Sequence, residues 1–144
     1  MRILNIFKAD TEHHRLGRYG ERVAARYLKK QGYKIRQRNF VAADAEIDII
    51  CESADTIVYV EVKTRTVGHA TEASRPAAAV TPEKQRKILR AARFYKPRHH
   101  VHKRQRFDIV EVYTDGKQPP HTVRICHMPG AFTRDTAYPP GRAH

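Results

Sequence analysis

Two short runs rich in β-branched residues carry three charged side chains that could together perform catalysis. Asp48 lies in the first run, residues 46–50, and Glu61 and Lys63 lie in the second, residues 57–63. A charge among apolar neighbours is unfavourable unless it is paired or bound to a metal. Two carboxylates and a lysine on adjoining strands therefore predict a divalent-cation site suited to attack on a phosphodiester.

The residues between the two runs predict a hairpin that brings the carboxylates together. Residues 53–56 are polar and suit a four-residue loop, so Glu52 would face Ile57. The same register places Asp48 opposite Glu61, with side chains about 5 Å apart. Opposed like charges are destabilising, so this arrangement calls for a cation, and Mg²⁺ or Mn²⁺ suits oxygen ligands. The alternative is an exposed sheet in which the lysine pairs with one carboxylate.

Hydrophobic periodicity predicts helices and strands that would hold these residues in a mixed sheet. The expected elements are a helix over 15–31, strands over 33–40, 46–50 and 57–63, a helix over 81–97, and strands over 106–113 and 122–128. An antiparallel start followed by a helical crossover indicates an α/β sandwich with helices flanking the sheet.

One domain is expected over residues 15–128, with loose termini at 1–14 and 129–144. Residues 64–80 lack periodicity and are expected to form a long mobile loop.

The charge balance favours a polyanionic partner. Of the 144 residues, 28 are Lys or Arg and 15 are Asp or Glu, a formal net charge of +13. Nucleic acid is favoured over an anionic membrane, because no basic amphipathic segment with bulky apolar anchors is evident. No run approaches membrane-spanning length, the start is too short and polar for a signal peptide, and the two cysteines form no paired motif. These features predict a cytoplasmic protein.

Helix phasing adds polar residues near the predicted site. Glu21 lies at the border of the apolar stripe of the first helix, and Gln85 lies on the inward stripe of the second. Each has a plain alternative, a surface ion pair for the first and a core hydrogen bond for the second. Basic side chains around the site are expected to contact the nucleic-acid backbone: Arg18, Arg22, Arg65, Lys84 and Arg86. The histidines show no zinc-site spacing and are expected to be solvated or to face phosphate.

Five segments, in this order, resemble the YraN family of endonuclease-like proteins in the PD-(D/E)xK nuclease superfamily. They are Gly17-Arg18-Tyr19-Gly20-Glu21, Arg38-Asn39-Phe40, Glu46-Ile47-Asp48-Ile49-Ile50, Val60-Glu61-Val62-Lys63-Thr64-Arg65 and Val80-Thr81-Pro82-Glu83-Lys84-Gln85. The resemblance covers roughly residues 15–113 and implies the restriction-endonuclease-like fold shared with Holliday-junction resolvases. Ile47 replaces the nominal proline and Ala45 the usual glycine, and neither change removes a catalytic atom.

The resemblance also implies roles for individual residues. Asp48, Glu61 and the Val62 carbonyl would be metal ligands, and Lys63 would be the catalytic lysine. Glu21 would be the helix-borne carboxylate that some resolvase-like members add to the site. In related nucleases a polar residue occupies the position of Gln85 beside the site.

The expected function is hydrolysis of DNA phosphodiester bonds by a Mg²⁺- or Mn²⁺-dependent endonuclease, with branched DNA as one substrate class. Two alternatives stay open: a non-catalytic nucleic-acid-binding module that keeps the nuclease fold, and a partner protein in DNA processing. Whether a homodimer is needed to cut two strands also stays open.

Overall fold

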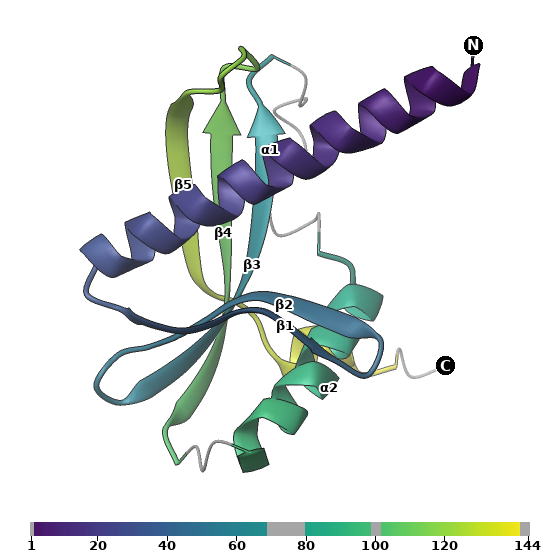
Figure 1. The fold of residues 1–144 in the computed structure, drawn as a ribbon. Coiled ribbons are helices and arrows are strands. Elements are labelled where there is room, and N and C mark those ends of the chain that lie inside the picture. The colour runs from purple at the N-terminus through teal and green to yellow at the C-terminus, as the bar shows by residue number, and fades with distance from the viewer. Residues whose placement is uncertain (1, 69–79, 99–101, 142–144) are drawn as a thin grey trace.

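The computed structural model describes residues 2–68, 80–98 and 102–141, and its sheet is mixed as predicted (Figure 1). The elements are α1 (Arg2–Lys30), β1 (Lys34–Ala42), β2 (Ala45–Glu52), β3 (Thr56–Thr66), α2 (Pro82–Arg98), β4 (Arg104–Thr114), β5 (Thr122–Phe132) and α3 (Arg134–Ala137). The five strands are ordered β1-β2-β3-β4-β5 across one sheet. β3 and β4 are parallel, and the other neighbouring pairs are antiparallel.

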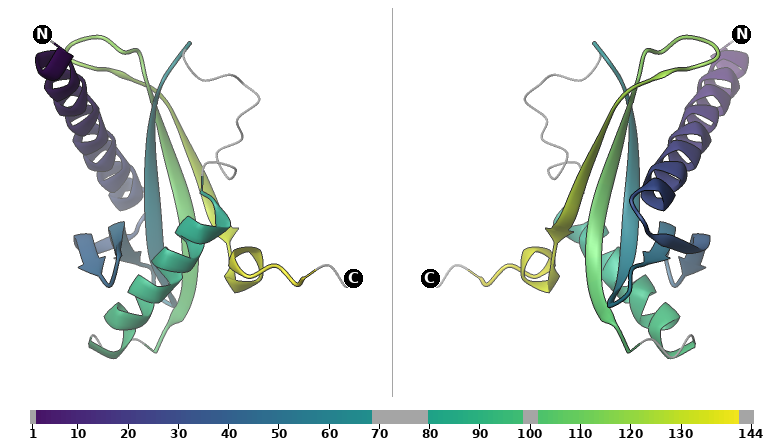
Figure 2. Two further views of the ribbon diagram at one scale, coloured as in Figure 1. Left: turned by 90° about the vertical axis from the view of Figure 1, so that its right-hand side faces the viewer. Right: turned by 90° about the vertical axis from the view of Figure 1, so that its left-hand side faces the viewer.

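The helices cover opposite sides of strands β3 to β5 (Figure 2). α1 packs over a cluster formed by Ala24, Ala25, Leu28, Ile49, Cys51, Val58, Val60, Val110 and Val112. α2 packs over a second cluster that includes Ile47, Ile50, Tyr59, Ile88, Ala91, Ala92, Tyr95, Phe107 and Ile109. The chain connects β3 to the parallel strand β4 through α2, since parallel neighbours require a crossover. The predicted α/β class, with helices flanking a mixed sheet, is confirmed.

The ends of several elements differ from the sequence-based expectations. α1 begins at Arg2, so residues expected to form a loose leader are helical. Residues 2–14 contain neither Pro nor Gly, so nothing in them interrupts a helix that continues from Arg15. β5 extends to Phe132 and is followed by α3, a single turn too short to give a periodic signal.

The expected loop over 64–80 also begins later, because β3 continues to Thr66, and residues 69–79 lie outside the described residues. Of the histidines near residue 100, His99 and His100 also lie outside them, and His102 is exposed. Within the described ranges, no helix has the length and apolar character needed to span a membrane.

Candidate active site

The site lies where β2 separates from β3. The hairpin pairs Glu52 with Ile57 and continues to Ile49 with Val60, so the predicted register is confirmed over this stretch. Asp48 and Glu61 are the next residues on the two strands. The backbone N–H of Val62 donates a hydrogen bond of 2.8 Å to Asp48 Oδ2, which holds this carboxylate against β3 beside Glu61.

Glu61 is a nearly buried carboxylate with two ammonium groups beside it. Its side chain is only 6% exposed, and Lys63 Nζ lies 3.5 Å from its Oε1 atom. Lys84 Nζ, from the first turn of α2, lies 3.9 Å from the same oxygen. Thr81 caps that turn, accepting a hydrogen bond of 3.2 Å from the Lys84 N–H, as its position before Pro82 predicts. The start of α2 therefore adds a second cation to the strand-borne pair.

The negative charges of the carboxylates around Asp48 are not fully balanced by nearby positive groups. Burial, followed by the nearby charge of Glu61, raises the pKa of Asp48 from 3.8 to about 8, although the Val62 N–H opposes the shift. Glu21 and Glu46 add smaller contributions in the same direction. The pKa of Glu21 is also raised, first by burial and then by Glu46. Asp48, Glu61, Glu21 and Glu46 together form an acidic cluster. Because their charges oppose one another, the cluster favours a proton or a cation between its carboxylates.

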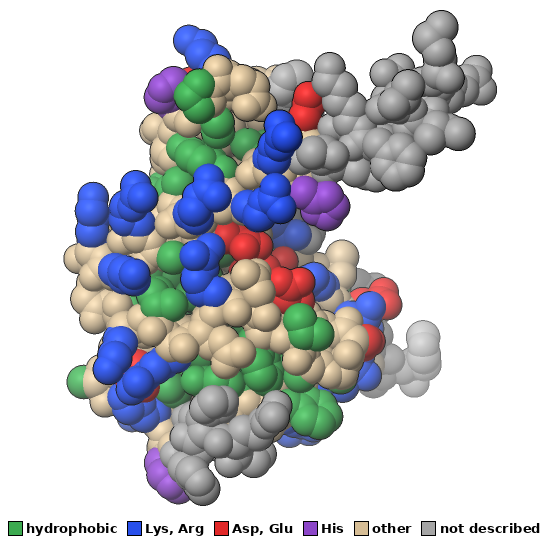
Figure 3. All heavy atoms as spheres, in the orientation of Figure 1, with side chains coloured by type: hydrophobic (Ala, Val, Ile, Leu, Met, Phe, Trp, Pro, Cys, Tyr) green, Lys and Arg blue, Asp and Glu red, His purple; other side chains and the backbone are tan. Residues whose placement is uncertain are grey.

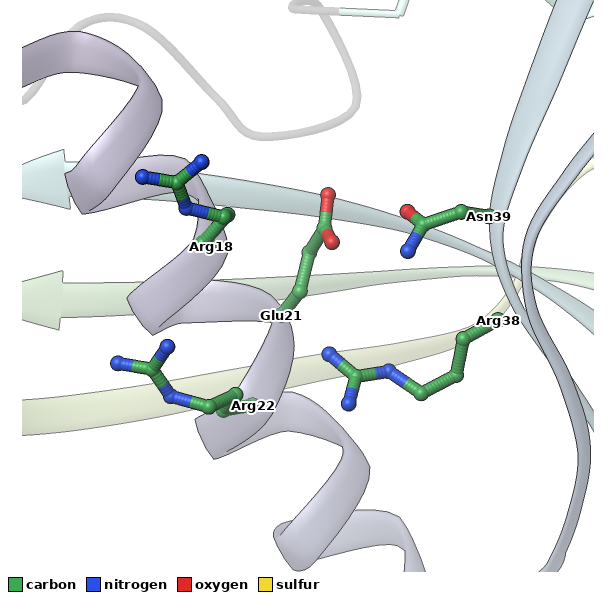
Figure 4. A pocket seen from close by; sticks show the side chains of 5 residues that line it. All are labelled: Arg18, Glu21, Arg22, Arg38 and Asn39. Carbon is green, nitrogen blue, oxygen red and sulfur yellow. The ribbon is translucent and has the colours of Figure 1, made fainter. Parts of the chain in front are cut away.

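Asn39 links the two outer carboxylates of the cluster. With its amide oriented to satisfy its hydrogen bonds, the nitrogen donates to Glu46 Oε1 at 2.9 Å and to Glu21 Oε2 at 3.1 Å. Asn39 has a φ of 53°, a left-handed conformation that asparagine tolerates better than most residues. Glu21 and Asn39 point toward each other from α1 and β1 (Figure 4). Sequence reasoning assigned no role to Glu46 or Asn39, although both lie in the segments that carry the family resemblance.

A close approach of α1 to β3 places Glu21 at the cluster. A Cβ atom added to Gly20 would lie 1.8 Å from Thr64 Oγ1 and 2.9 Å from Thr64 Cβ, so only glycine fits there. Because Glu21 follows directly, the helix-borne carboxylate is set down next to the strand that carries Glu61. Glu21 thus lies beside Asp48 and Glu46, and no ion pair within 4 Å engages it in the described part of the chain.

Three other predicted residues are engaged by protein partners away from the acidic cluster. The Gln85 amide donates to the Val80 carbonyl at 2.9 Å, and its oxygen accepts from the Thr136 hydroxyl at 2.8 Å. These contacts are the core hydrogen bonds of the alternative interpretation. Arg65 Nε bonds to the buried Glu111 at 2.6 Å, and Arg86 donates to a backbone carbonyl of α3 at 3.0 Å.

The donor set fits a hard divalent cation. Asp48, Glu61 and the Val62 carbonyl offer only oxygen ligands, the type that Mg²⁺ and Mn²⁺ prefer. Among the described residues, no group of three or more His, Cys, Asp or Glu side chains forms a ready-made metal cage. Mg²⁺ is commonly held by one or two carboxylates together with water and phosphate oxygens, so a small donor set suits it.

The surface around the site is divided by charge. Acidic side chains gather near the middle of the face in Figure 3, and Lys and Arg side chains surround much of this patch. The two kinds of charge are therefore separated on this face, with the acidic side chains at its middle.

Comparison with known proteins identifies the family. Residues 20–112 match the model described as "Uncharacterised protein family UPF0102". A "UPF0102 protein" of Geobacter metallireducens is 42% identical over 118 residues, which cover 81% of this chain and 91% of the relative. Similar proteins occur in Syntrophomonas wolfei, with 42% identity over 81% of this chain and 96% of the relative, and in Desulforapulum autotrophicum, with 42% identity over 88% and 99%.

The chain therefore belongs to the UPF0102 family, which is the YraN family that the sequence motifs resemble. The matched segment includes every predicted site residue except Arg18.

Proposed function

We propose that this protein is a metal-dependent endonuclease that hydrolyses phosphodiester bonds in DNA. The observation that carries the proposal is the placement of Asp48 beside Glu61 by the Val62 N–H, with Lys63 Nζ at 3.5 Å from Glu61. The raised pKa of Asp48 supports a cation there, since its charge is not balanced by the protein. The resemblance of the sequence motifs to those of the PD-(D/E)xK nucleases supports the same chemistry.

Asp48, Glu61 and the Val62 carbonyl would hold Mg²⁺ or Mn²⁺. Such an ion, when bound, polarises a phosphate and offsets the charge that develops on its oxygens. Lys63 stands beside Glu61 and can orient the attacking water or donate a hydrogen bond to a phosphate oxygen. The water oxygen forms a bond to phosphorus and its proton passes to solvent, while the bond from phosphorus to one sugar oxygen breaks and that oxygen takes up a proton from solvent.

The substrate is inferred from charge and from the family resemblance. A net charge of +13 favours a nucleic acid, since each phosphate contact releases counterions. The likeness to Holliday-junction resolvases suggests branched DNA as the substrate class to test first. A homodimer would bring two sites to the two strands of such a junction.

The test is a cleavage assay on linear duplex, flapped and four-way DNA in Mg²⁺, in Mn²⁺ and in chelator. We expect cleavage that requires the metal and falls at least about 100-fold in Asp48→Asn and in Glu61→Gln. Asp44→Asn is a matched control, because Asp44 is exposed and pairs with Lys87 and Arg90 away from the cluster.

Cleavage that survives both site substitutions would remove the proposed site. Binding without cleavage of any substrate would instead support the non-catalytic nucleic-acid-binding module.

A further inference from the structure

A pocket beside the acidic cluster gathers three arginines. Its volume is about 280 Å³, and it is lined by Arg18, Glu21, Arg22, Arg38 and Asn39. Figure 4 shows the two arginines of α1 on one side of Glu21 and the Arg38 side chain extending toward α1 from β1. Residues of α1 and β1 therefore line one open space.

The three guanidinium groups are not neutralised by the protein. Among the described residues, none of the three has a carboxylate within 4.0 Å, whereas Arg36, Arg65 and Arg106 each pair with a Glu or an Asp. All three pocket arginines are exposed. Three cationic side chains that line one space favour the binding of an anion there.

Glu21 does not cancel this charge. One carboxylate against three guanidinium groups leaves a formal charge of about +2 in the pocket. The Glu21 carboxylate accepts a hydrogen bond from Asn39 and feels the charge of Arg38, but it forms no ion pair within 4.0 Å with any of the three arginines. The guanidinium groups keep their planar donor faces, which match the geometry of a phosphate.

The pocket and the acidic cluster have one residue in common, Glu21. Glu21 lines the pocket, and its pKa is raised first by burial and then by the charges of Glu46 and Glu61 in the cluster. A strand that places one phosphate in the pocket would therefore bring an adjoining phosphodiester toward Asp48 and Glu61.

We propose that Arg18, Arg22 and Arg38 form a phosphate-binding pocket that holds a nucleic-acid strand next to the acidic cluster. The phosphate is an internal phosphodiester of the strand or a phosphate at its end. The placement of an adjoining bond at the cluster rests on the proposed nuclease function, whereas the binding of phosphate in the pocket does not.

The test measures binding of short labelled DNA strands by fluorescence anisotropy in chelator, so that no cleavage occurs. We expect Arg38→Gln to raise Kd about 10-fold and to lower the slope of log K against log salt by about 0.7 to 1, as the loss of one phosphate contact does. Arg26→Gln is the matched control, because Arg26 is exposed on α1 but does not line the pocket, and it should change Kd less than about 2-fold.

Strands with and without a terminal phosphate separate the two sources. A pocket for a terminal phosphate gives tighter binding of the phosphorylated strand, and Arg38→Gln abolishes that difference. A pocket for an internal phosphate gives equal binding of both strands, with the same loss in Arg38→Gln for each. Circular dichroism verifies that the variants are folded.

Equal losses in Arg38→Gln, Arg22→Gln and Arg26→Gln would overturn the pocket and leave only a diffuse basic surface. This outcome would not touch the nuclease proposal, which depends on Asp48 and Glu61. Absence of cleavage with a selective loss in Arg38→Gln would retain the pocket and reject the nuclease.

Discussion

Replacing Asp48 with Asn is expected to stabilise the metal-free protein at alkaline pH. The pKa of Asp48 rises from 3.8 in the free residue to about 8 in the fold, mainly through burial and then through Glu61. The folded state therefore holds the proton more tightly than the unfolded state. Stability linked to this proton is complete below about pH 4 and is lost as the pH rises through about 8. Asn resembles the protonated acid and can still accept the Val62 hydrogen bond.

The magnitude follows from the shift. About four pH units at about 1.4 kcal/mol each give an upper limit of about 6 kcal/mol. Asp48 is partly exposed, so solvent and salt screen its charge, and we expect about 2 kcal/mol at pH 8.5. Near pH 4 the two proteins should have similar free energies of unfolding, since Asp48 is protonated in the folded state and only about half ionised in the unfolded state.

Urea unfolding followed by circular dichroism measures this difference in chelator at the two pH values. Asp44→Asn is the control: it removes an exposed carboxylate paired with Lys87 and Arg90, so a small loss and no alkaline gain are expected. The reasoning fails if Asp48→Asn is no more stable than wild type at pH 8.5, or if its gain is the same at both pH values.

Three further outcomes are expected. Below about pH 8 the affinity for Mn²⁺ should rise about tenfold per pH unit, because binding of the metal releases the proton from Asp48. Calorimetry in two buffers can count this proton, and Asp48→Asn should not release it. Gly20→Ala should lower the free energy of unfolding by about 1–3 kcal/mol, because the added methyl group clashes with Thr64. Gly17→Ala, whose methyl group meets no atom within 4 Å, should raise the free energy of unfolding by about 0.5–1 kcal/mol. Equal changes in the two variants, measured by denaturant titration, would contradict this expectation. Lys63→Met should reduce DNA cleavage about 100-fold while Kd in chelator changes little, and a parallel loss of binding would assign Lys63 to strand attachment instead.

The hairpin and its register could be predicted because local signals agree. Alternating β-branched residues predict both strands, and the polar loop fixes the pairing of Glu52 with Ile57. Asp48 and Glu61 follow from that register by simple counting along the strands. The cap of α2 at Thr81 was likewise predictable, because a capping residue before Pro82 marks a helix start.

The outer part of the site could not be predicted from the chain alone. Asn39 bonds to Glu21 and Glu46, and that contact depends on how closely α1 approaches the sheet at Gly20 and Thr64. Such an approach is a property of tertiary packing and leaves no periodic signal. The partner of Arg65 is also distant in sequence, so its bond to Glu111 was not foreseen, whereas the core hydrogen bonds of Gln85 are the alternative that helix phasing left open.

A buried carboxylate marks a functional site only when the protein leaves its charge unbalanced, and this chain contains both cases. Asp108 is fully buried, and burial alone would raise its pKa. Hydrogen bonds from His127, Arg106 and the Gly130 N–H outweigh that effect, so the pKa of Asp108 is lowered. Arg106 contributes two of these bonds, each 2.8 Å long. Asp48 has one backbone donor and several acidic neighbours, and its pKa rises. The protein therefore compensates the charge of Asp108 by itself, whereas the charge of Asp48 needs a proton or a cation for its compensation. For this reason the proposed metal chemistry is assigned to Asp48 and Glu61 rather than to the more deeply buried acid.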